Sequence, residues 1–209
     1  MSKYLWVLDA GHGGVINGEY VTQGKRSPIW DDGSQYFEEV GNRNICNKLV
    51  QKLNKHDIEC INIMEGINQD ISLPERCAIA NKIYDKNKNM IFISQHSNGF
   101  TKESANGFSI YTSRGETKSD QIATYFYESM EKEFPKHKSR KDYTDGDADK
   151  EANFYVLKHT KSPAILIENF FMTNYKESKQ LMSQRFVNRI VESHYLAIKN
   201  IEDSETTFF

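Results

Sequence analysis

The sequence predicts an α/β fold: a single domain built on a mostly parallel, twisted β-sheet with helices on both faces. Short apolar runs that are typical of buried strands alternate along the chain with longer stretches whose apolar residues recur at helical spacing. This alternation favours parallel strands, because parallel neighbours need a long crossover connection that a helix usually supplies. A chain of 209 residues fits one domain with a sizeable core.

The first half of the chain contains five expected elements. They are a strand at Tyr4–Asp9, a helix at Glu38–Lys55, a strand at Ile58–Met64, a helix from Ser72 to Tyr84 and a strand at Met90–Ser94. The second helix begins with a capping box, a pattern in which Ser72 and Glu75 accept hydrogen bonds from each other's backbone N–H. Pro74 in its first turn strengthens this assignment, because the fixed φ of proline suits the start of a helix.

The second half continues the alternation and ends in a long helix. Its expected elements are a strand at Phe108–Thr112, a helix at Ser119–Phe134, a short extended piece at Phe154–Leu157, a strand at Ala164–Ile167 and a helix at Ser183–Ile201. We therefore place the single domain at residues 1–202 and expect residues 203–209 to form a disordered tail.

Two stretches, Val15–Gln35 and Lys136–Glu151, show no periodicity. The first contains several glycines and aromatic residues, and the second is dense in Lys, Asp, Gly and Arg. Loops of this length inside a compact domain are usually functional. Because both stretches would lie near strand ends, we expect them to border the substrate cleft.

Composition narrows the function classes. Charged residues make up 27% of the chain and hydrophobic ones 38%, and the formal net charge of -2 gives no sign of attraction to nucleic acid or to an acidic membrane. No apolar run approaches the roughly 20 residues of a membrane span. Met1-Ser2-Lys3 leads directly into the first strand, so we expect no secretory signal and synthesis in the cytoplasm. We also expect a monomer, and we expect the three cysteines to be buried thiols rather than metal ligands.

Two histidines follow apolar runs in the same manner. His12 stands in Gly11-His12-Gly13-Gly14 after the first strand, and His96 follows Met90–Ser94. Ligands bind at the carboxyl ends of parallel strands, and imidazoles together with a carboxylate are ligands of catalytic zinc. A single Gly-His-Gly-Gly is also compatible with a tight turn or an anion cradle. The repetition at His96 favours a shared metal site.

A hydrolytic zinc site needs a third protein ligand and a general base. Glu19, Glu38 and Glu39 lie between the two histidines, and the residue pattern alone does not separate Glu38 from Glu39 at the start of the expected helix. Glu168 follows the fully apolar strand Ala164–Ile167. A carboxylate there is costly to bury unless it is paired or used, so we interpret Glu168 as a general base rather than as a cap or a salt-bridge partner.

Four motifs in this order resemble the zinc-dependent N-acetylmuramoyl-L-alanine amidases of the amidase-3 type, over about residues 4 to 200. They are Leu8-Asp9-Ala10-Gly11-His12-Gly13-Gly14, Glu38 with Asn42 four residues later, Ser94-Gln95-His96-Ser97-Asn98, and Leu166-Ile167-Glu168-Asn169-Phe170-Phe171-Met172-Thr173-Asn174. The resemblance implies one Zn²⁺ per chain held by His12, Glu38 and His96. It also implies that Glu168 is the catalytic acid/base. The spacing of Glu38 to Asn42 is what selects Glu38 over Glu39.

The resemblance also implies the substrate, the reaction and the site of action. Peptidoglycan or a muropeptide would be cleaved between N-acetylmuramic acid and L-alanine, releasing the stem peptide in cell-wall lysis or remodelling. Arg76, in a segment similar to the family's helix after the second strand, is expected to fix a loop by a salt bridge. The chain departs from the family by the longer loop before Glu38, which leaves the substrate preference open. The missing signal resembles a phage endolysin, although a secreted enzyme without its signal would look the same.

Two alternatives remain open at this level. A zinc peptidase or carboxypeptidase acting on the stem peptide would use the same types of ligand. A non-catalytic peptidoglycan-binding domain would keep the fold, but such domains typically lose a ligand or the base, and all four candidates are present here.

Overall fold

The structure is a computed structural model that describes residues 2–13, 15–16, 19–20, 22, 25–66 and 70–208. Within these residues a six-stranded sheet has the order β4-β1-β5-β8-β6-β7. The strands are β4 (Cys60–Asn62), β1 (Leu5–Ala10), β5 (Met90–Asn98), β8 (Ala164–Phe171), β6 (Ser109–Thr112) and β7 (Lys150–Glu151). The first four are parallel, β6 is antiparallel to β8, and β7 is parallel to β6. The predicted α/β class with a mostly parallel sheet is confirmed.

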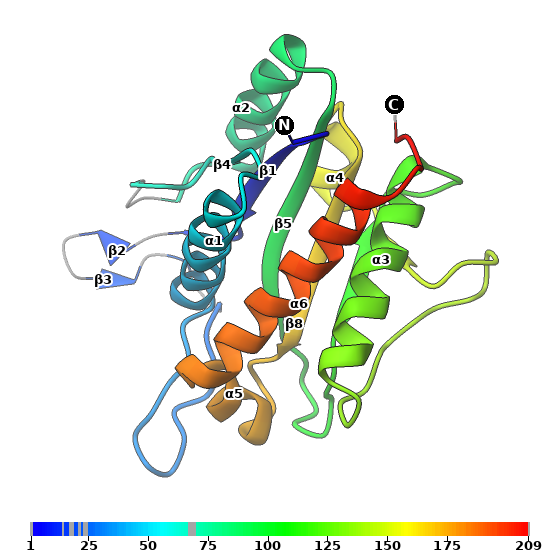
Figure 1. Cartoon of the computed structure of the whole chain (residues 1–209). Helices are drawn as coiled ribbons and strands as arrows, with labels where there is room; N and C mark the ends of the chain where they lie inside the picture. The colour runs from blue at the N-terminus through cyan, green and yellow to red at the C-terminus, as the bar shows by residue number, and fades with distance from the viewer. Residues whose placement is uncertain are drawn as a thin grey trace.

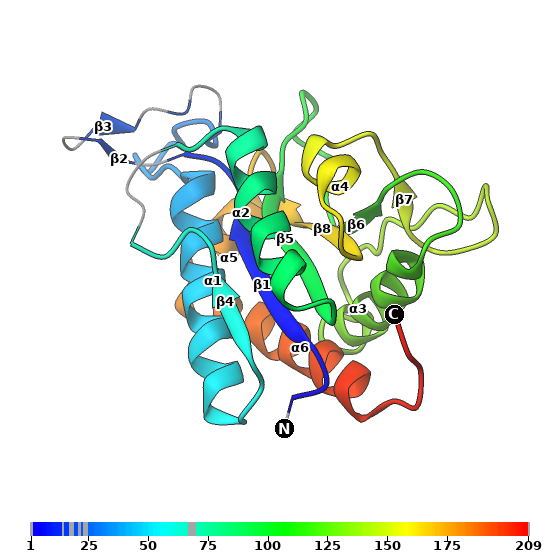
Figure 2. The same cartoon turned by 90° about the horizontal axis from the view of Figure 1, so that it is seen from above.

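Helices cover both faces of this sheet. Figures 1 and 2 show α1 (Glu38–Lys55), α6 (Gln184–Asp203) and α3 (Lys118–Glu133) on one face, and α2 (Leu73–Lys86) and α4 (Tyr155–His159) on the other. The short helix α5 (Tyr175–Leu181) links β8 to α6. The connection from β1 through α1 to β4 runs one way along the sheet, and the connection from β4 through α2 to β5 runs the other way, so α1 and α2 lie on opposite faces. No helix in the described ranges is long and apolar enough to cross a membrane.

The core lies between the central strands and the helices. Leu8, Ile93 and Ile167, from three neighbouring strands, have no exposed surface. Strands buried on both faces read as continuous apolar runs, which is why these runs predicted them. The capping box predicted for the second helix is also present, since Glu75 N donates to Ser72 Oγ and Ser72 N donates to Glu75 Oε2.

Some predicted boundaries and types were wrong. The piece Phe154–Leu157, expected to be extended, leads into the helix α4, because four apolar residues are too few to reveal a period. The strands β5 and β8 continue four residues beyond their predicted ends. Backbone hydrogen bonds between strands do not depend on the type of side chain, so the two strands continue through polar residues that the apolar pattern does not include. The stretch Val15–Gln35 contains a two-stranded ribbon, β2 (Val15–Ile16) with β3 (Glu19–Tyr20), while its glycines 18 and 24 lie outside the described residues.

The C-terminal segment also differs from the expected disordered tail. Residue 203 ends α6, and residues 204–208 pass beside the start of the chain. Lys3 Nζ donates to the carbonyls of Ser204 and Thr206. The Phe208 ring is fully buried, 5.8 Å from the Tyr4 ring centre. Burial of one aromatic side chain outweighs the polar composition of the residues before it.

Candidate metal centre

The four predicted site residues meet at the carboxyl edge of the parallel strands. His12 lies two residues beyond β1, and Glu38 is the first residue of α1. His96 and Glu168 face each other as register partners in β5 and β8. Ligands of open α/β sheets bind at this edge, so the fold places the four side chains where a site is expected.

Three donor atoms form a small triangle. Glu38 Oε1 lies 3.2 Å from His12 Nε2 and 3.1 Å from His96 Nδ1, and these two nitrogens are 3.1 Å apart. Donors about 2.0–2.1 Å from one zinc ion at tetrahedral angles lie about 3.3 Å from each other. Two imidazoles and one carboxylate are also a donor set of catalytic zinc. The size and chemistry of the triangle therefore fit this metal.

The charges in the triangle favour a cation at its centre. Burial raises the pKa of Glu38, but its hydrogen bonds with His12 and His96 outweigh burial and hold the pKa below its usual range. Burial lowers the pKa of His12, which favours the neutral ring that a metal requires. Burial also lowers the pKa of His96, but the hydrogen bond with Glu38 and the charge of Glu168 outweigh it and raise that pKa.

Glu168 lies beside the triangle, where β8 runs next to β5. Its Oε2 atom is buried and has no hydrogen-bond partner among the described residues. Burial raises the pKa of Glu168 to about 7, against the opposing effect of nearby His96. A carboxyl group with this pKa can both accept and return a proton near neutral pH.

The structure separates Glu38 from its neighbour Glu39. Although both carboxylates are buried, Glu39 Oε1 lies 3.9 Å from Arg43 Nε, one helical turn away. Glu38 Oε1 instead faces the histidines and accepts a hydrogen bond from Ser97 N at 3.2 Å. The Ser97 hydroxyl is in turn 3.0 Å from the Tyr36 hydroxyl. Glu38 is thus held by both its helix and β5.

Side chains hold the loop that carries His12. The carbonyls of residues Ala10–Gly13 accept hydrogen bonds, in chain order, from Arg76, Asn42, Arg76 and Arg43. His12 itself has a φ of 66°, in the left-handed region that non-glycine residues rarely adopt. Four anchored carbonyls in succession fix this strained backbone and so aim the imidazole.

Arg76 reaches this loop from a buried ion pair. Its Nη1 lies 2.5 Å from Asp9 Oδ1, and Asp9 Oδ2 accepts a hydrogen bond from Ser94 Oγ at 2.7 Å. Arg76 and Asp9 are both almost fully buried. The salt bridge expected for Arg76 is therefore present, and it ties α2 to β1 next to His12.

A glycine makes room for the second histidine. A Cβ atom at Gly11 would lie 2.2 Å from His96 Cε1. We expect Gly11→Ala to weaken zinc binding about 10-fold or more, because the His96 ring would have to leave the triangle. The measurement is zinc affinity by competition with a chromogenic chelator. Gly99→Ala is the control, since its Cβ would meet the flexible end of Met172 at 3.2 Å and Thr173 Cγ2 at an ordinary contact distance of 3.7 Å. Equal zinc affinity in Gly11→Ala and the wild type would contradict the close packing of His96.

Buried amides on the opposite face of the sheet hold β5 to β8 near the site. Asn169 Nδ2 donates to Gln95 Oε1 at 2.7 Å and to the His96 carbonyl at 3.2 Å. Gln95 Nε2 lies 3.3 Å from Nδ1 of His194 in α6, and burial lowers the pKa of His194 to about 3, which keeps the ring neutral. The network spans the point where the register shifts, next to Phe170 with its φ of 64°.

Two cavities open on either side of the triangle. One, of about 640 Å³, lies against α2 and α4 and is lined partly by Leu73, Phe154 and Tyr155. The other, of about 420 Å³, is more polar and is lined by residues that follow β5 and β8. His12 and Glu168 line both cavities. A substrate could therefore extend in two directions from the reacting bond.

The two aperiodic stretches differ in their relation to these cavities. Lys25, from the first stretch, lines both cavities. No residue of Lys136–Glu151, all of it described, lines either one, so the expectation for this stretch was wrong. Sequence reasoning missed the cavity wall formed by α4, because the pattern of Phe154–Leu157 predicts only a short extended piece. The adjacent aromatic residues Phe154 and Tyr155, in the segment that leads to the strand carrying Glu168, were the available signal.

Comparisons with known proteins identify the family of the chain. A family model described as Amidase_3, N-acetylmuramoyl-L-alanine amidase, matches residues 7–200. A Buchnera aphidicola (subsp. Acyrthosiphon pisum) protein, provisionally named an N-acetylmuramoyl-L-alanine amidase, is 26% identical over 96% of this chain and 95% of its own. An endolysin of Bacillus phage SPP1 is also 26% identical, and the match covers 96% of this chain and 66% of the endolysin. The crystal structure of an N-acetylmuramoyl-L-alanine amidase from Clostridium difficile 630 superposes with a TM-score of 0.81 at 25% identity, covering 99% of this chain and all of that one.

Proposed function

The chain belongs to the N-acetylmuramoyl-L-alanine amidase family, a family of peptidoglycan amidases, and from this membership we propose a zinc-dependent reaction carried out by His12, Glu38, His96 and Glu168. The bond cleaved is the amide between the lactyl group of N-acetylmuramic acid and L-alanine. The observation that carries the proposal is the donor triangle of His12, Glu38 and His96 with Glu168 beside it, whose Oε2 atom has no hydrogen-bond partner among the described residues.

In this proposal one zinc ion per chain is held by His12, Glu38 and His96. Zinc supplies Lewis-acid chemistry there, since it lowers the pKa of water and polarises a carbonyl group. Glu168 takes the proton from the attacking water and then delivers it to the nitrogen of the departing L-alanine. Arg76 and Asn42 keep His12 in place while the proton moves.

The cavities on either side suit this bond. A hydrolase that separates a sugar from a peptide needs room for two different groups, and the centre lies between a partly apolar and a more polar cavity. The resemblance to a phage endolysin supports action on the bacterial cell wall in lysis, and wall remodelling by a bacterial enzyme uses the same reaction.

Product analysis tests the proposal. A purified muropeptide is incubated with the protein, with and without a chelator, and the fragments are identified by mass spectrometry. We expect an intact stem peptide with a free L-alanine amine, and we expect the chelator to abolish its release and added zinc to restore it. Cleavage inside the peptide would instead indicate a peptidase, and binding without cleavage by the zinc-loaded protein would indicate a non-catalytic domain.

A further inference from the structure

A second group of oxygen donors lies away from the zinc centre, at the start of α3. Carboxylate oxygens of Asp120, Asp147 and Asp149 all lie within 4.8 Å of one another. Asp120 belongs to the first turn of α3, and the other two precede β7 in the stretch Lys136–Glu151. None of the three lines the cavities beside the zinc centre, so the proposed amidase reaction does not use them.

Two oxygens of this group are buried without a donor. Asp149 is only 2% exposed, and although its Oδ2 accepts from Thr112 Oγ1 at 2.5 Å, its Oδ1 is buried with no hydrogen-bond partner in the described chain. Oδ1 of Asp147 is also buried and unpartnered. A buried carboxylate oxygen without a donor is costly, so these atoms indicate a ligand that the protein itself does not provide.

The charges of the group are uncompensated. No lysine, arginine or histidine among the described residues forms an ion pair with Asp120, Asp147 or Asp149. The negative charge of Asp120 is partly stabilised by other means. Its carboxylate accepts hydrogen bonds from Thr117 in the capping box of α3, and it lies at the positive end of the helix dipole. That explanation does not extend to the other two. Burial raises the pKa of Asp149 to about 7, with a further contribution from the neighbouring Asp147 and against the opposing hydrogen bond from Thr112.

We propose that Asp120, Asp147 and Asp149 bind a structural Ca²⁺ ion that fastens the stretch Lys136–Glu151 to β6 and α3. The donors are all oxygens, which suits a hard cation rather than zinc. Ca²⁺ accepts oxygens at 2.3–2.6 Å in flexible geometry, so opposite ligands lie about 4.6–5.2 Å apart, and the observed spread fits within that shell. Mg²⁺ needs near-ideal octahedral geometry and usually keeps several waters, which makes it the weaker match.

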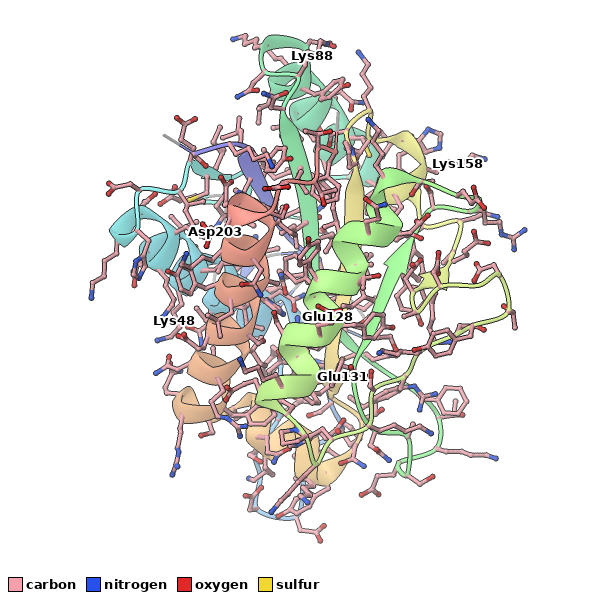
Figure 3. The ribbon with its side chains drawn as sticks, turned by 45° about the vertical axis from the view of Figure 1, so that its right-hand side comes forward. Lys48, Lys88, Glu128, Glu131, Lys158 and Asp203 are labelled. Atoms are coloured by element: carbon pink, nitrogen blue, oxygen red, sulfur yellow. The ribbon has the colours of Figure 1, made fainter. Side chains whose placement is uncertain are left out.

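The sequence around this group has a matching pattern. Asp145, Asp147 and Asp149 alternate with other residues, as do the first ligands of Ca²⁺-binding helix–loop–helix loops, and Gly146 adopts a φ of 111°. The structure uses Asp120 from α3 in place of Asp145, which is exposed. The same stretch is tied to α3 a second time by Lys141 Nζ and Glu131 Oε1, 2.9 Å apart; Figure 3 shows Glu131 on α3. The proposed Ca²⁺ site and this ion pair together would explain how the stretch Lys136–Glu151, which has little regular secondary structure, adopts a single conformation.

The alternative occupant is a proton shared between Asp147 and Asp149. One proton neutralises one of three charges, whereas a divalent cation offsets two. The two occupants also respond differently to calcium and to substitution, since an asparagine can replace a protonated aspartate but removes a ligand charge.

Thermal unfolding of the full chain in calcium-free buffer, with and without CaCl₂, tests the proposal. We expect saturating Ca²⁺ to raise the Tm by about 5 °C, as binding to the native state alone requires, and terbium to bind with tyrosine-sensitised luminescence that Ca²⁺ displaces. Asp147→Asn and Asp149→Asn should lose the Tm rise, whereas the exposed control Asp145→Asn should keep it. The rise should persist in His96→Ala, which separates this site from the zinc centre.

Three results would overturn the proposal. The first is a wild-type Tm that does not change with Ca²⁺ while Asp149→Asn is as stable as the wild type, which would establish the shared proton. The second is a Tm rise with Ca²⁺ in Asp147→Asn and Asp149→Asn that is as large as the rise in the wild type. The third is loss of the response in His96→Ala, which would place the calcium at the zinc centre.

Discussion

Glu168→Gln is expected to lower the amidase turnover about 10²- to 10⁴-fold while zinc stays bound at one ion per chain. Glutamine keeps the shape of the side chain but cannot take a proton from water, and general-base catalysis is worth about this factor. Because Glu168 Oε2 is buried without a hydrogen-bond partner in the described part of the chain, removing its charge should leave the Tm unchanged or higher. The measurements are kcat on a defined muropeptide, zinc content and thermal unfolding.

The control for this variant is Glu128→Gln, which removes a carboxylate from the exposed side of α3, where Figure 3 labels it. It should match the wild type in all three measurements. Substantial turnover in zinc-loaded Glu168→Gln would exclude the general-base role. A simultaneous loss of zinc would show that the residue is a ligand instead.

His96→Ala is expected to lose both zinc and turnover. The imidazole supplies one corner of the donor triangle, with Nδ1 3.1 Å from both Glu38 Oε1 and His12 Nε2. Even residues that only support ligands weaken metal binding 10- to 100-fold when they are replaced, so loss of a ligand should exceed about 100-fold. His12→Ala should behave in the same way. Zinc content after dialysis against a weak chelator and kcat are the measurements.

The matched control is His56→Ala, because His56 is an exposed histidine at the end of α1 that stacks on Tyr195. It should keep full zinc and turnover. Full zinc retention in His96→Ala would refute that residue's assignment as a ligand. Retention of turnover without zinc would refute the metal-dependent reaction as a whole.

The sequence could predict where the candidate residues lie in the fold because apolar strands carry their own signal. His12, His96 and Glu168 each follow a buried apolar run, and parallel strands bring such ends to one edge. The choice between Glu38 and Glu39 needed the resemblance to the family. Both residues are buried at the start of α1, and only the packing of that helix shows that one faces the histidines and the other Arg43.

The features that the sequence did not predict depend on contacts between segments that are far apart in the chain. The apolar residues of α4 are too few to show whether they form a helix or a strand, and the burial of Phe208 depends on Tyr4 at the other end of the chain. The grouping of Asp120 with Asp147 and Asp149 likewise joins a helix start to a stretch with no periodicity. Local patterns predict elements, but such pairings are decided by tertiary packing.

The most direct test of the account is an anomalous-difference map from crystals of the protein, collected on both sides of the zinc absorption edge. The account predicts one strong zinc peak per chain, bound by His12 Nε2, Glu38 Oε1 and His96 Nδ1 and close to the Glu168 carboxyl. A zinc peak bound by other residues, or crystals of active enzyme with no zinc peak at this triangle, would contradict it.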